Sequence, residues 1–366
     1  MTDLKNVSYL EMAYGLAEKA RGWASPNPYV GAVIVHQGAI VGYGFHERPG
    51  NPHAEAVALK RAGRLAKGST LYVTLEPCVH WGRTPPCVDA VIQAAPRQVV
   101  ISSLDPNPVV FQKGVRKLRR AGIDVSVGLL AERNKVLNEN YIKFITTGTP
   151  FVTLKAAVSL DGRMAARTGE SRWISSAATR EYVHLLRGEQ DAVMVGIQTI
   201  LQDDPLLTVR HDQWAGKKIA RIVLDSSLRF PLRARILSTL AEGKIFVLTS
   251  PSAPLRKKEA LTKKGVEIVE IPGSRRGINI KLALRWMGER GIAGLLVEGG
   301  SGLLTSLIEQ RLADKLFLTF SPRLIGGGGA LCLLEGSGVR AIEEAWRVRM
   351  TSLFTIGEDV IWEGYF

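Results

Sequence analysis

Apolar positions at helical spacing open the chain: Leu10, Ala13, Tyr14 and Ala17 share one face of a helix predicted over 8–21. Short apolar runs bounded by turn residues then predict strands at 30–35, 39–45, 70–75, 98–103 and 123–127. Further helices are predicted at 53–66, 87–95 and 113–121. Helices that alternate with strands are typical of an α/β layer structure.

A second α/β series follows the first. The stretch near 139–150 is predicted to link the two, and we expect domains at 1–147 and 148–366. Strands of the second series are predicted at 151–159, 191–196, 219–224, 244–249, 266–270, 293–298 and 314–320. Helices are predicted at 176–187, 278–290 and 301–310. This order indicates a second α/β domain with a largely parallel sheet.

Composition agrees with a soluble protein of two domains. A chain of 366 residues can form two separate cores, and 46% hydrophobic with 22% charged residues is ordinary for globular proteins. No apolar run approaches the ~18–20 residues that span a membrane, and the N-terminus lacks the pattern of an export signal. Three cysteines build no disulfide framework. We therefore expect a cytoplasmic protein with no membrane partner.

The net charge of +14 is shared equally between residues 1–149 and the rest of the chain, so no charged tail accounts for it. Polyanion binding is one interpretation of such an excess. The interpretation that we favour is a solvated basic surface on a protein that binds phosphorylated ligands. Nucleic acid is therefore not an expected partner.

Four residues between positions 53 and 87 indicate a zinc site. His53, Cys78 and Cys87 form a ligand set that suits a catalytic zinc with one position left for water. Glu55 lies two residues from His53, close enough to act on that water without binding the metal. Zinc-dependent nucleoside and nucleobase deaminases use such ligands with a free glutamate. The stretch therefore predicts a hydrolytic deaminase.

The predicted elements would bring these four residues together. The histidine and the glutamate would lie in the first turn of one helix, and the end of a strand would deliver the first cysteine. The second cysteine would open a helix, whose N-terminus favours the thiolate that zinc requires. A lone histidine or cysteine is more often structural, but the four together favour a catalytic site. His80 is a rival ligand, which we expect in a substrate loop or facing solvent.

The spacing of the cysteines narrows the class of deaminase. Eight residues, V-H-W-G-R-T-P-P, separate Cys78 from Cys87, whereas the common form has two. The run P-C-V-H-W-G-R-T-P-P-C resembles the deaminase half of bacterial bifunctional riboflavin-biosynthesis deaminase–reductases. The resemblance covers nearly the whole chain, including P-N-P-Y-V-G at 26–31, D-P-N-P at 105–108, L-K-A-A-V-S-L-D-G-R at 154–163 and V-E-G-G at 297–300.

The resemblance implies two activities on two folds. The first domain would be a cytidine-deaminase-like three-layer domain that hydrolytically deaminates 2,5-diamino-6-ribosylamino-4(3H)-pyrimidinone 5′-phosphate, with Glu55 as the proton carrier. The second would resemble dihydrofolate reductase and would reduce the ribosyl group to ribityl with NADPH. By the same resemblance, Asn27 would contact the ribose or base of the substrate. The alternative for Asn27 is a plain turn residue.

A glycine-rich segment is the candidate cofactor site of the second domain. No G-x-G-x-x-G follows the domain's first strand, so a Rossmann fingerprint is absent. The run G-L-L-V-E-G-G-S-G-L-L at 294–304 predicts a strand, a tight turn and a helix start that could hold a pyrophosphate. Such turns are more often only structural, and it is the resemblance that assigns this one to NADPH. The run G-G-G-G at 326–329 has no assigned role.

The resemblance also assigns single residues of the second domain. Arg187 and Arg210 would suit a sugar phosphate, because the guanidinium fork of an arginine matches phosphate oxygens. The alternative for these two residues is a surface ion pair. Core packing of Trp173 and a cap role for Asp203 are further alternatives. The NADPH contacts would be Ala157, Trp173, Thr199, Asp203, Ser226, Gly300, Ser301, Gly302, Leu303, Leu304, Thr305 and Ser306. The substrate contacts would be Ser171, Arg187, Leu207, Arg210 and Glu298.

Two aspects of the reductase site remain open from the sequence. Lys155, Asp203 and Glu298 are all candidates for steering proton delivery, and the sequence does not rank them. The run R-I-V-L-D-S-S-L-R at 221–229 offers hydroxyls and then Arg229 after a buried strand, which we expect to bind the 2′-phosphate of NADPH. An ordinary turn beside a solvated arginine is the alternative.

Two rival functions differ in class from the one that we favour. A nucleic-acid deaminase, such as a tRNA adenosine editor with an accessory domain, would predict a short C-x-x-C and no second nucleotide-binding domain. A non-catalytic scaffold would not need the intact set of zinc ligands and glutamate. We therefore expect an enzyme with one zinc ion per chain, NADPH and a phosphorylated pyrimidine substrate. A homo-oligomer, dimer or tetramer, is also expected.

Overall fold

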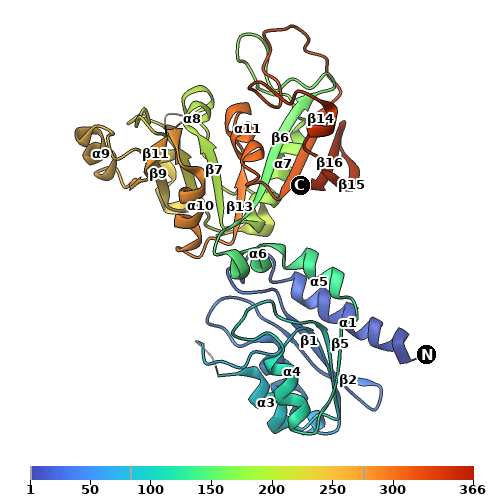
Figure 1. Cartoon of the computed structure of the whole chain (residues 1–366). Helices are drawn as coiled ribbons and strands as arrows, with labels where there is room; N and C mark the ends of the chain where they lie inside the picture. The colour runs from blue at the N-terminus through green and yellow to red at the C-terminus, as the bar shows by residue number, and fades with distance from the viewer. Residues whose placement is uncertain (1, 83–84, 275–276) are drawn as a thin grey trace. The chain divides into compact units, whose positions relative to one another are not determined.

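Two separate sheets organise the chain, each in its own unit (Figure 1). Unit 1 is Met1–Gly148 and unit 2 is Thr149–Phe366. The computed structural model describes residues 2–82, 85–274 and 277–366. Residues 83 and 84, in the run between the two cysteines, lie outside the described residues. In the described part of the chain, the helices are all too short or too polar to span a bilayer.

Unit 1 is built on a five-stranded sheet in the order β2-β1-β3-β4-β5. The first strand is antiparallel to both of its neighbours, whereas the last three are parallel to one another. Gln37 and Gly38 join the first two strands in a tight turn with positive φ at both residues, as two-residue hairpin turns require. The strands are β1 (Gly31–His36), β2 (Ala39–Phe45), β3 (Thr70–Leu75), β4 (Gln98–Ser103) and β5 (Asp124–Val127).

Helices cover both faces of this sheet, which makes the predicted three layers. The face with Ile34, Val73 and Ile101 packs against α2, α3 and α4. The opposite face, with Val33 and Val100, packs against α1. The helices are α1 (Thr2–Glu18), α2 (Ala54–Ala62) with the 3-10 turn η1 (Gly63–Ala66), α3 (Cys87–Ala94), α4 (Lys113–Arg120), α5 (Ala131–Leu137) and α6 (Glu139–Thr147).

The stretch predicted as a linker is a helix instead. Residues 139–147 form α6, directly after a helix, α5, that the pattern did not predict. Tyr141 is buried against the core of unit 1, which explains why this stretch belongs to that unit. Gly148, with a φ of 70°, ends the helix, and only two residues then precede the first strand of unit 2.

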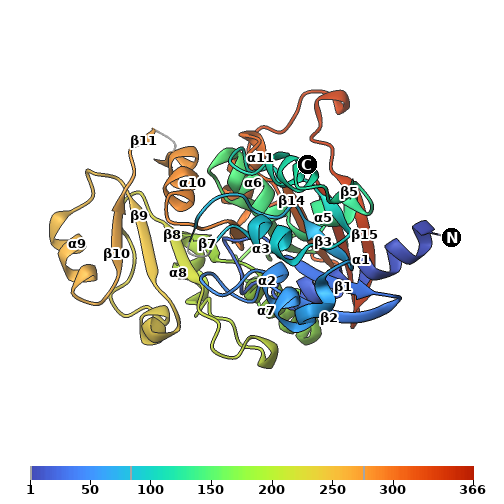
Figure 2. The ribbon, with the colours of Figure 1, turned by 90° about the horizontal axis from the view of Figure 1, so that it is seen from below.

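Unit 2 is built on a nine-stranded, largely parallel sheet in the order β10-β9-β8-β7-β13-β6-β14-β16-β15. The strands β10 and β15 lie at opposite ends of it (Figure 2). Only the last two pairings, β14 with β16 and β16 with β15, are antiparallel. The strands are β6 (Phe151–Ser159), β7 (Ala192–Gly196), β8 (Ala220–Leu224), β9 (Ile245–Thr249), β10 (Glu267–Glu270), β13 (Gly294–Val297), β14 (Lys315–Ser321), β15 (Arg349–Ile356) and β16 (Asp359–Tyr365).

Helices lie on both faces of the second sheet. On one face, Leu284 and Leu304 bring α10 and α11 against the central strands, in front of the sheet in Figure 1. On the other, Ile200 of α8 and Leu261 of α9 pack against β7, β8 and β9. The helices are α7 (Ala177–Glu189), α8 (Ile197–Asp203), α9 (Leu255–Thr262), α10 (Ile280–Gly288) and α11 (Ser301–Glu309). Short elements are η2 (Asp212–Trp214), β11 (Gly273–Ser274), β12 (Gly277–Ile278), η3 (Arg235–Glu242) and η4 (Ile342–Glu344).

Two long irregular segments, 160–176 and 322–348, run side by side at one end of unit 2 (Figure 1). The Leu160 N–H donates to the Arg323 carbonyl at 2.8 Å, and the Met164 N–H donates to the Leu331 carbonyl at 2.7 Å. The four-glycine run at 326–329 lies in the second segment. There the Gly326 N–H donates to Asp161 Oδ2 at 2.6 Å. These bonds tie the two segments together.

Candidate active sites

The first site brings the three predicted zinc ligands together. His53 is the N-cap of α2, Cys87 is the first residue of α3, and Cys78 follows the end of β3. His53 Nδ1 lies 3.1 Å from Cys87 Sγ and 3.6 Å from Cys78 Sγ. Tetrahedral zinc with bonds of ~2.0–2.3 Å needs ligand atoms about 3.3–3.8 Å apart. The distance to Cys78 lies within this range and the distance to Cys87 is about 0.2 Å shorter, so a small adjustment would let the three residues hold a zinc ion, with Nδ1 as the imidazole ligand.

The rival ligand lies outside this cluster. Within the described ranges, His53, Cys78 and Cys87 form the only group of three or more His, Cys, Asp and Glu side chains that lie close enough together to hold a metal ion. His80 is exposed and lines the pocket beside it, as predicted for a residue of the substrate loop. The Cys87 N–H donates to Cys78 Sγ at 3.3 Å, a backbone bond that orients the first thiol.

The two thiols differ in acidity. A hydrogen bond from Cys87 lowers the pKa of Cys78 to about 4, with a further contribution from His53. The same bond, together with burial, raises the pKa of Cys87. Cys78 is therefore the more acidic of the two thiols, and metal binding would favour the thiolate form of both.

Glu55 lies in the first turn of α2, where only 3% of it is exposed. Burial raises the pKa of Glu55 to about 7, and the neighbouring Cys78 adds to the shift. The side chain is not part of the metal-ligand cluster. Its position beside the cluster suits a group that takes up and returns a proton.

Two of the zinc ligands, His53 and Cys78, line a cavity of about 330 Å³ in unit 1 together with Glu55. Asn27, which the resemblance had singled out, lines it too, and its Nδ2 lies 2.9 Å from His46 Nε2. Burial raises the pKa of Asp105, another lining residue, to about 6, and the Tyr141 hydroxyl donates to Asp105 Oδ1 at 2.8 Å. His46, Asp105 and Tyr141 were not predicted, although Asp105 opens the D-P-N-P run.

A second cavity, of about 820 Å³, lies in unit 2. It is lined by residues from the end of β6, from α7 and α8, and from the turn after β13. Twelve of the predicted reductase residues line it: Lys155, Ala157, Ser171, Trp173, Arg187, Thr199, Asp203, Leu207, Arg210, Glu298, Gly300 and Ser301.

The other predicted cofactor contacts lie outside the cavity lining. Ser226 is half-buried in the turn after β8, and Arg229 is exposed three residues later. Five more residues continue along α11, beyond the helix start that lines the cavity: Gly302, Leu303, Leu304, Thr305 and Ser306. Leu304 is 1% exposed and packs in the core, so its side chain is unavailable to a ligand. The roles assigned to these residues stay predictions.

Arg187 and Glu298 bind each other. Arg187 Nε donates to Glu298 Oε1, and Nη2 donates to Oε2 at 2.8 Å. Arg187 Nη1 donates to the Thr208 carbonyl at 3.0 Å. Burial opposes the charged form of Glu298, but the Arg187 guanidinium holds the pKa of that carboxyl below its usual range. The fork predicted to hold a phosphate thus holds a carboxylate, and Arg210 is the arginine better placed to meet an anion.

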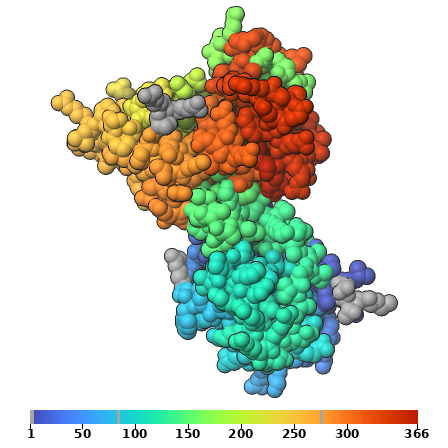
Figure 3. All heavy atoms as spheres, viewed as in Figure 1, coloured from blue at the N-terminus to red at the C-terminus, as the bar shows by residue number. Residues whose placement is uncertain are grey.

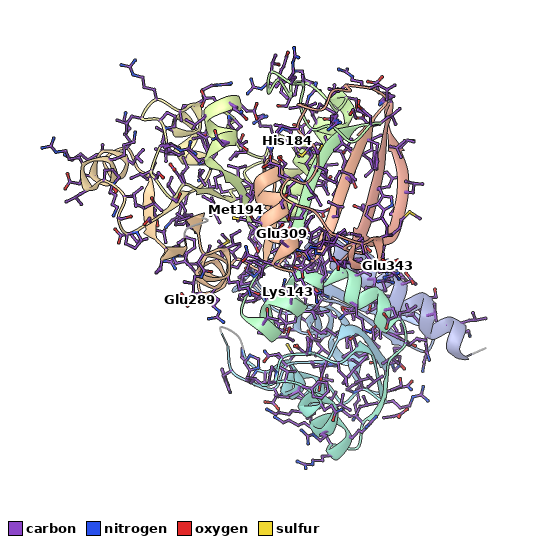
Figure 4. The ribbon with its side chains drawn as sticks, turned by 45° about the horizontal axis from the view of Figure 1, so that its top comes forward. Lys143, His184, Met194, Glu289, Glu309 and Glu343 are labelled. Atoms are coloured by element: carbon purple, nitrogen blue, oxygen red, sulfur yellow. The ribbon has the colours of Figure 1, made fainter. Side chains whose placement is uncertain are left out.

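Two other ionisable groups, Lys155 and His184, contribute to the electrostatics of this cavity. Burial lowers the pKa of Lys155, and Glu298 offsets part of that shift. His184 (labelled in Figure 4) accepts the Arg210 backbone N–H at Nδ1, at 3.2 Å. Burial, and then Arg187 and Arg210, lower the pKa of His184 to about 4, so it is neutral at pH 7. Trp173 is 58% exposed, which excludes the core-packing alternative.

Comparisons with known proteins match a different family to each of the two units. The family described as "Cytidine and deoxycytidylate deaminase zinc-binding region" matches residues 4–103. The family described as "RibD C-terminal domain" matches residues 150–362. These matches confirm the predicted fold class, a deaminase domain followed by a reductase domain.

Relatives match over nearly the whole chain. Riboflavin biosynthesis protein RibD of Aquifex aeolicus is 45% identical over 97% of this chain and 96% of its own. The protein of that name from Escherichia coli is 38% identical, over 96% and 97%. These full-length matches do not favour a nucleic-acid deaminase with an accessory domain.

Solved structures share the fold of the entire chain. Acinetobacter baumannii RibD has a TM-score of 0.89 and 34% identity, covering 100% of this chain and 99% of that one. A Thermotoga maritima diaminohydroxyphosphoribosylaminopyrimidine deaminase/5-amino-6-(5-phosphoribosylamino)uracil reductase has a TM-score of 0.86 and 33% identity, with the same coverage. This chain therefore belongs to the RibD family of bifunctional riboflavin biosynthesis enzymes.

Proposed function

We propose that the chain catalyses two successive steps of riboflavin biosynthesis, one in each unit. Unit 1 hydrolytically deaminates the diaminopyrimidinone ribosyl phosphate, and unit 2 reduces its ribosyl group to ribityl with NADPH. The observation that carries the proposal is the presence of two separate cavities with different chemistry. One holds a zinc-ligand cluster beside a buried glutamate, and the other holds lysine and arginine side chains beside a glycine turn.

In unit 1, the side chains divide the work of deamination. His53, Cys78 and Cys87 would hold zinc, which when bound makes water a better nucleophile at neutral pH. Glu55 would carry two protons in turn: the first from this water to the ring nitrogen, and the second from the hydroxyl then bound to the ring carbon to the amino group, which leaves as ammonia. Burial of Glu55 keeps each proton from bulk solvent during its transfer.

In unit 2, the side chains orient two phosphorylated ligands. NADPH, when bound, supplies the hydride that converts the ribosyl group to ribityl. Arg210 offers a cation to the substrate phosphate, because the Arg187 fork is engaged by Glu298. Lys155 is the ionisable candidate best suited to giving up a proton, since burial lowers its pKa. Asp203 lies 3.5 Å from Arg172 Nε and is held in an ion pair instead.

Glu55→Gln tests the assignment of two sites. We expect the variant to keep its zinc and to lose deamination by about 10²–10⁴-fold, the usual cost of removing a general acid–base group. Reduction of supplied deaminated intermediate should be unchanged. Glu132→Gln, at an exposed glutamate of unit 1, is the matched control. If both activities fall together in a folded Glu55→Gln variant, the assignment is wrong.

We further propose a homo-oligomer, a dimer or a tetramer, in the cytoplasm. The three cysteines are free of disulfides, which suits a reducing compartment. The edge strand β15 carries exposed Met350 and Leu353, and C-terminal segments form part of the surface in Figure 3. An exposed strand edge can pair with another chain. Light scattering should give a multiple of 39.9 kDa, and a single-chain mass would overturn this proposal.

A further inference from the structure

Glu76 is a buried carboxylate that the deamination chemistry does not use. It follows β3 directly, two residues before the zinc ligand Cys78, and is 3% exposed. Glu76 Oε1 accepts the Val115 N–H at 3.1 Å, and Oε2 accepts the Gln112 N–H at 3.0 Å. Oε2 also receives the Asp105 N–H, at 3.4 Å. Both oxygens are therefore engaged by backbone donors.

These three donors come from two different segments. Asp105 lines the deaminase cavity in the turn after β4, whereas Gln112 and Val115 belong to the start of α4. The N-cap residue Gln112 makes no side-chain cap bond, so Glu76 supplies the acceptor that the first N–H groups of α4 require. One carboxylate thus joins the segment that carries a zinc ligand to the opposite side of the cavity.

The start of α4 also presses directly on the chain before Cys78. A Cβ on Gly114 would lie 2.4 Å from the Pro77 carbonyl oxygen and 3.1 Å from Glu76 Cγ. The Glu76 N–H adds a bond to the Ser103 carbonyl of β4, at 2.9 Å. With contacts on three sides, the backbone from Glu76 to Cys78 has little freedom to shift.

A direct catalytic role for Glu76 does not fit this geometry. Although the residue lines the cavity, its two oxygens already accept three backbone hydrogen bonds. In the proposed deamination, the proton carrier is Glu55, which lies beside the metal cluster. What remains for Glu76 is to hold other groups in place.

We propose that Glu76 is a positioning residue of the deaminase site, whose carboxylate sets the place of Cys78 and of Asp105. This rests on the proposed zinc-dependent function of unit 1. Replacement of a residue that positions a metal ligand typically weakens metal binding by about 10–100-fold. Glu76 acts on the ligand through the backbone rather than by touching it.

Glu76→Gln in the full chain tests the proposal. Glutamine keeps the size but turns one oxygen into an amide NH₂, which must face a backbone N–H in either orientation. We expect the zinc dissociation constant, measured by chelator competition without substrate, to rise by about 10–100-fold. In the metal-free protein, hydrogen exchange of the Val115 and Gln112 amides should be faster. Reduction by unit 2 should be unchanged, which reports on the folding of the rest of the chain.

Two further variants keep the result interpretable. Glu76→Asp preserves both oxygens on a shorter side chain and should weaken zinc binding less than glutamine does. Gly114→Ala retains the Glu76 carboxylate but adds a methyl group that would clash with the Pro77 carbonyl and crowd Glu76, and it should weaken zinc binding as well. Glu132→Gln serves as the exposed control.

The outcomes separate this proposal from the proposed function. Wild-type zinc affinity in both Glu76→Gln and Glu76→Asp would overturn the positioning role. If Glu76→Gln fails to fold, Glu76→Asp decides: weaker zinc binding supports the role, and unchanged binding overturns it. A wild-type protein that binds zinc tightly but deaminates no pyrimidine would contradict the proposed function and leave the role of Glu76 standing.

Discussion

Single residues of the zinc cluster differ in how firmly the fold holds them. Cys87 is 3% exposed and opens a helix, and its backbone N–H is itself bonded to the other thiol. Cys78 lies in a loop and is only half-buried. His53 is fixed as an N-cap, with its Nδ1 facing both sulfurs. Loss of Cys87, the most buried of the three ligands, should therefore be the most damaging.

Cys87→Ser is expected to release zinc or bind it far more weakly, because a serine hydroxyl is a poor zinc ligand. His80→Ala should leave the zinc content at one ion per chain, since His80 lies outside the ligand cluster. Metal content after dialysis, measured by atomic emission, checks both variants. Full zinc in Cys87→Ser together with loss in His80→Ala would make His80 the third ligand.

Arg229→Ala is expected to weaken NADPH binding by about 10–150-fold, the value of one charge-assisted hydrogen bond, and to leave NADH almost untouched. The reason is that Arg229 follows the β8 end, where a 2′-phosphate could meet it with Ser226. Fluorescence titration with each cofactor measures the preference. Arg233→Ala, at another exposed arginine nearby, is the matched control. Equal losses for NADPH and NADH would place Arg229 elsewhere.

The zinc ligands and Glu55 could be predicted from the sequence because their residue types and spacing are local and specific. The pairing of Arg187 with Glu298 could not, because the two residues are 111 positions apart and meet only where α7 passes the end of β13. His184 lacked any sequence signal, since its pKa is lowered by burial and then by the two arginines that the fold places beside it.

At the scale of elements, glycines let a helix lie directly on the first sheet. A Cβ on Gly42 would lie 2.3 Å from the Ala58 carbonyl oxygen of α2. A Cβ on Gly44 would lie 2.7 Å from the Ala54 carbonyl oxygen and 2.6 Å from Val57 Cβ. Because Glu55 belongs to the same first turn of α2, the approach at Gly44 bears on the active site.

Gly44→Ala is expected to displace the start of α2, and so to lower both zinc affinity and deamination while reduction persists. The cost should resemble overpacking of a core, about 1–3 kcal/mol in the unfolding free energy of unit 1. Chemical denaturation and zinc titration measure the two effects. Gly15→Ala, in α1 with nothing within 4 Å, is the control and should be neutral or slightly stabilising. An unaffected Gly44→Ala variant would contradict the close packing.

Most strands were predicted because buried apolar runs mark them, whereas the last two strands, β15 and β16, were missed. In β15, exposed and half-buried residues follow one another with few apolar contacts, so the edge strand escaped notice. The signal that could have found it is the two-residue turn at Gly357 and Glu358, which joins it to β16. The helices α5, α8 and α9, of seven or eight residues each, were also not predicted.

On the scale of the whole molecule, the two units are contiguous in sequence and each holds a complete cavity. The last helix of unit 1 reaches the deaminase cavity through Tyr141, and the first strand of unit 2 reaches the other through Lys155. The activities can therefore be separated by single substitutions, as the predicted Glu55→Gln phenotype requires.

The strand order of unit 2 has a consequence for synthesis on the ribosome. Unit 1 can close its sheet as soon as residue 148 has emerged, because all of its strands are already present. β6 must wait, since its partners β13 and β14 are translated more than a hundred residues later. At ~5–20 residues per second, that delay is about 7–30 s. During it, β6 is an apolar strand without its sheet, so we expect it to be the segment of the nascent chain that most needs a chaperone.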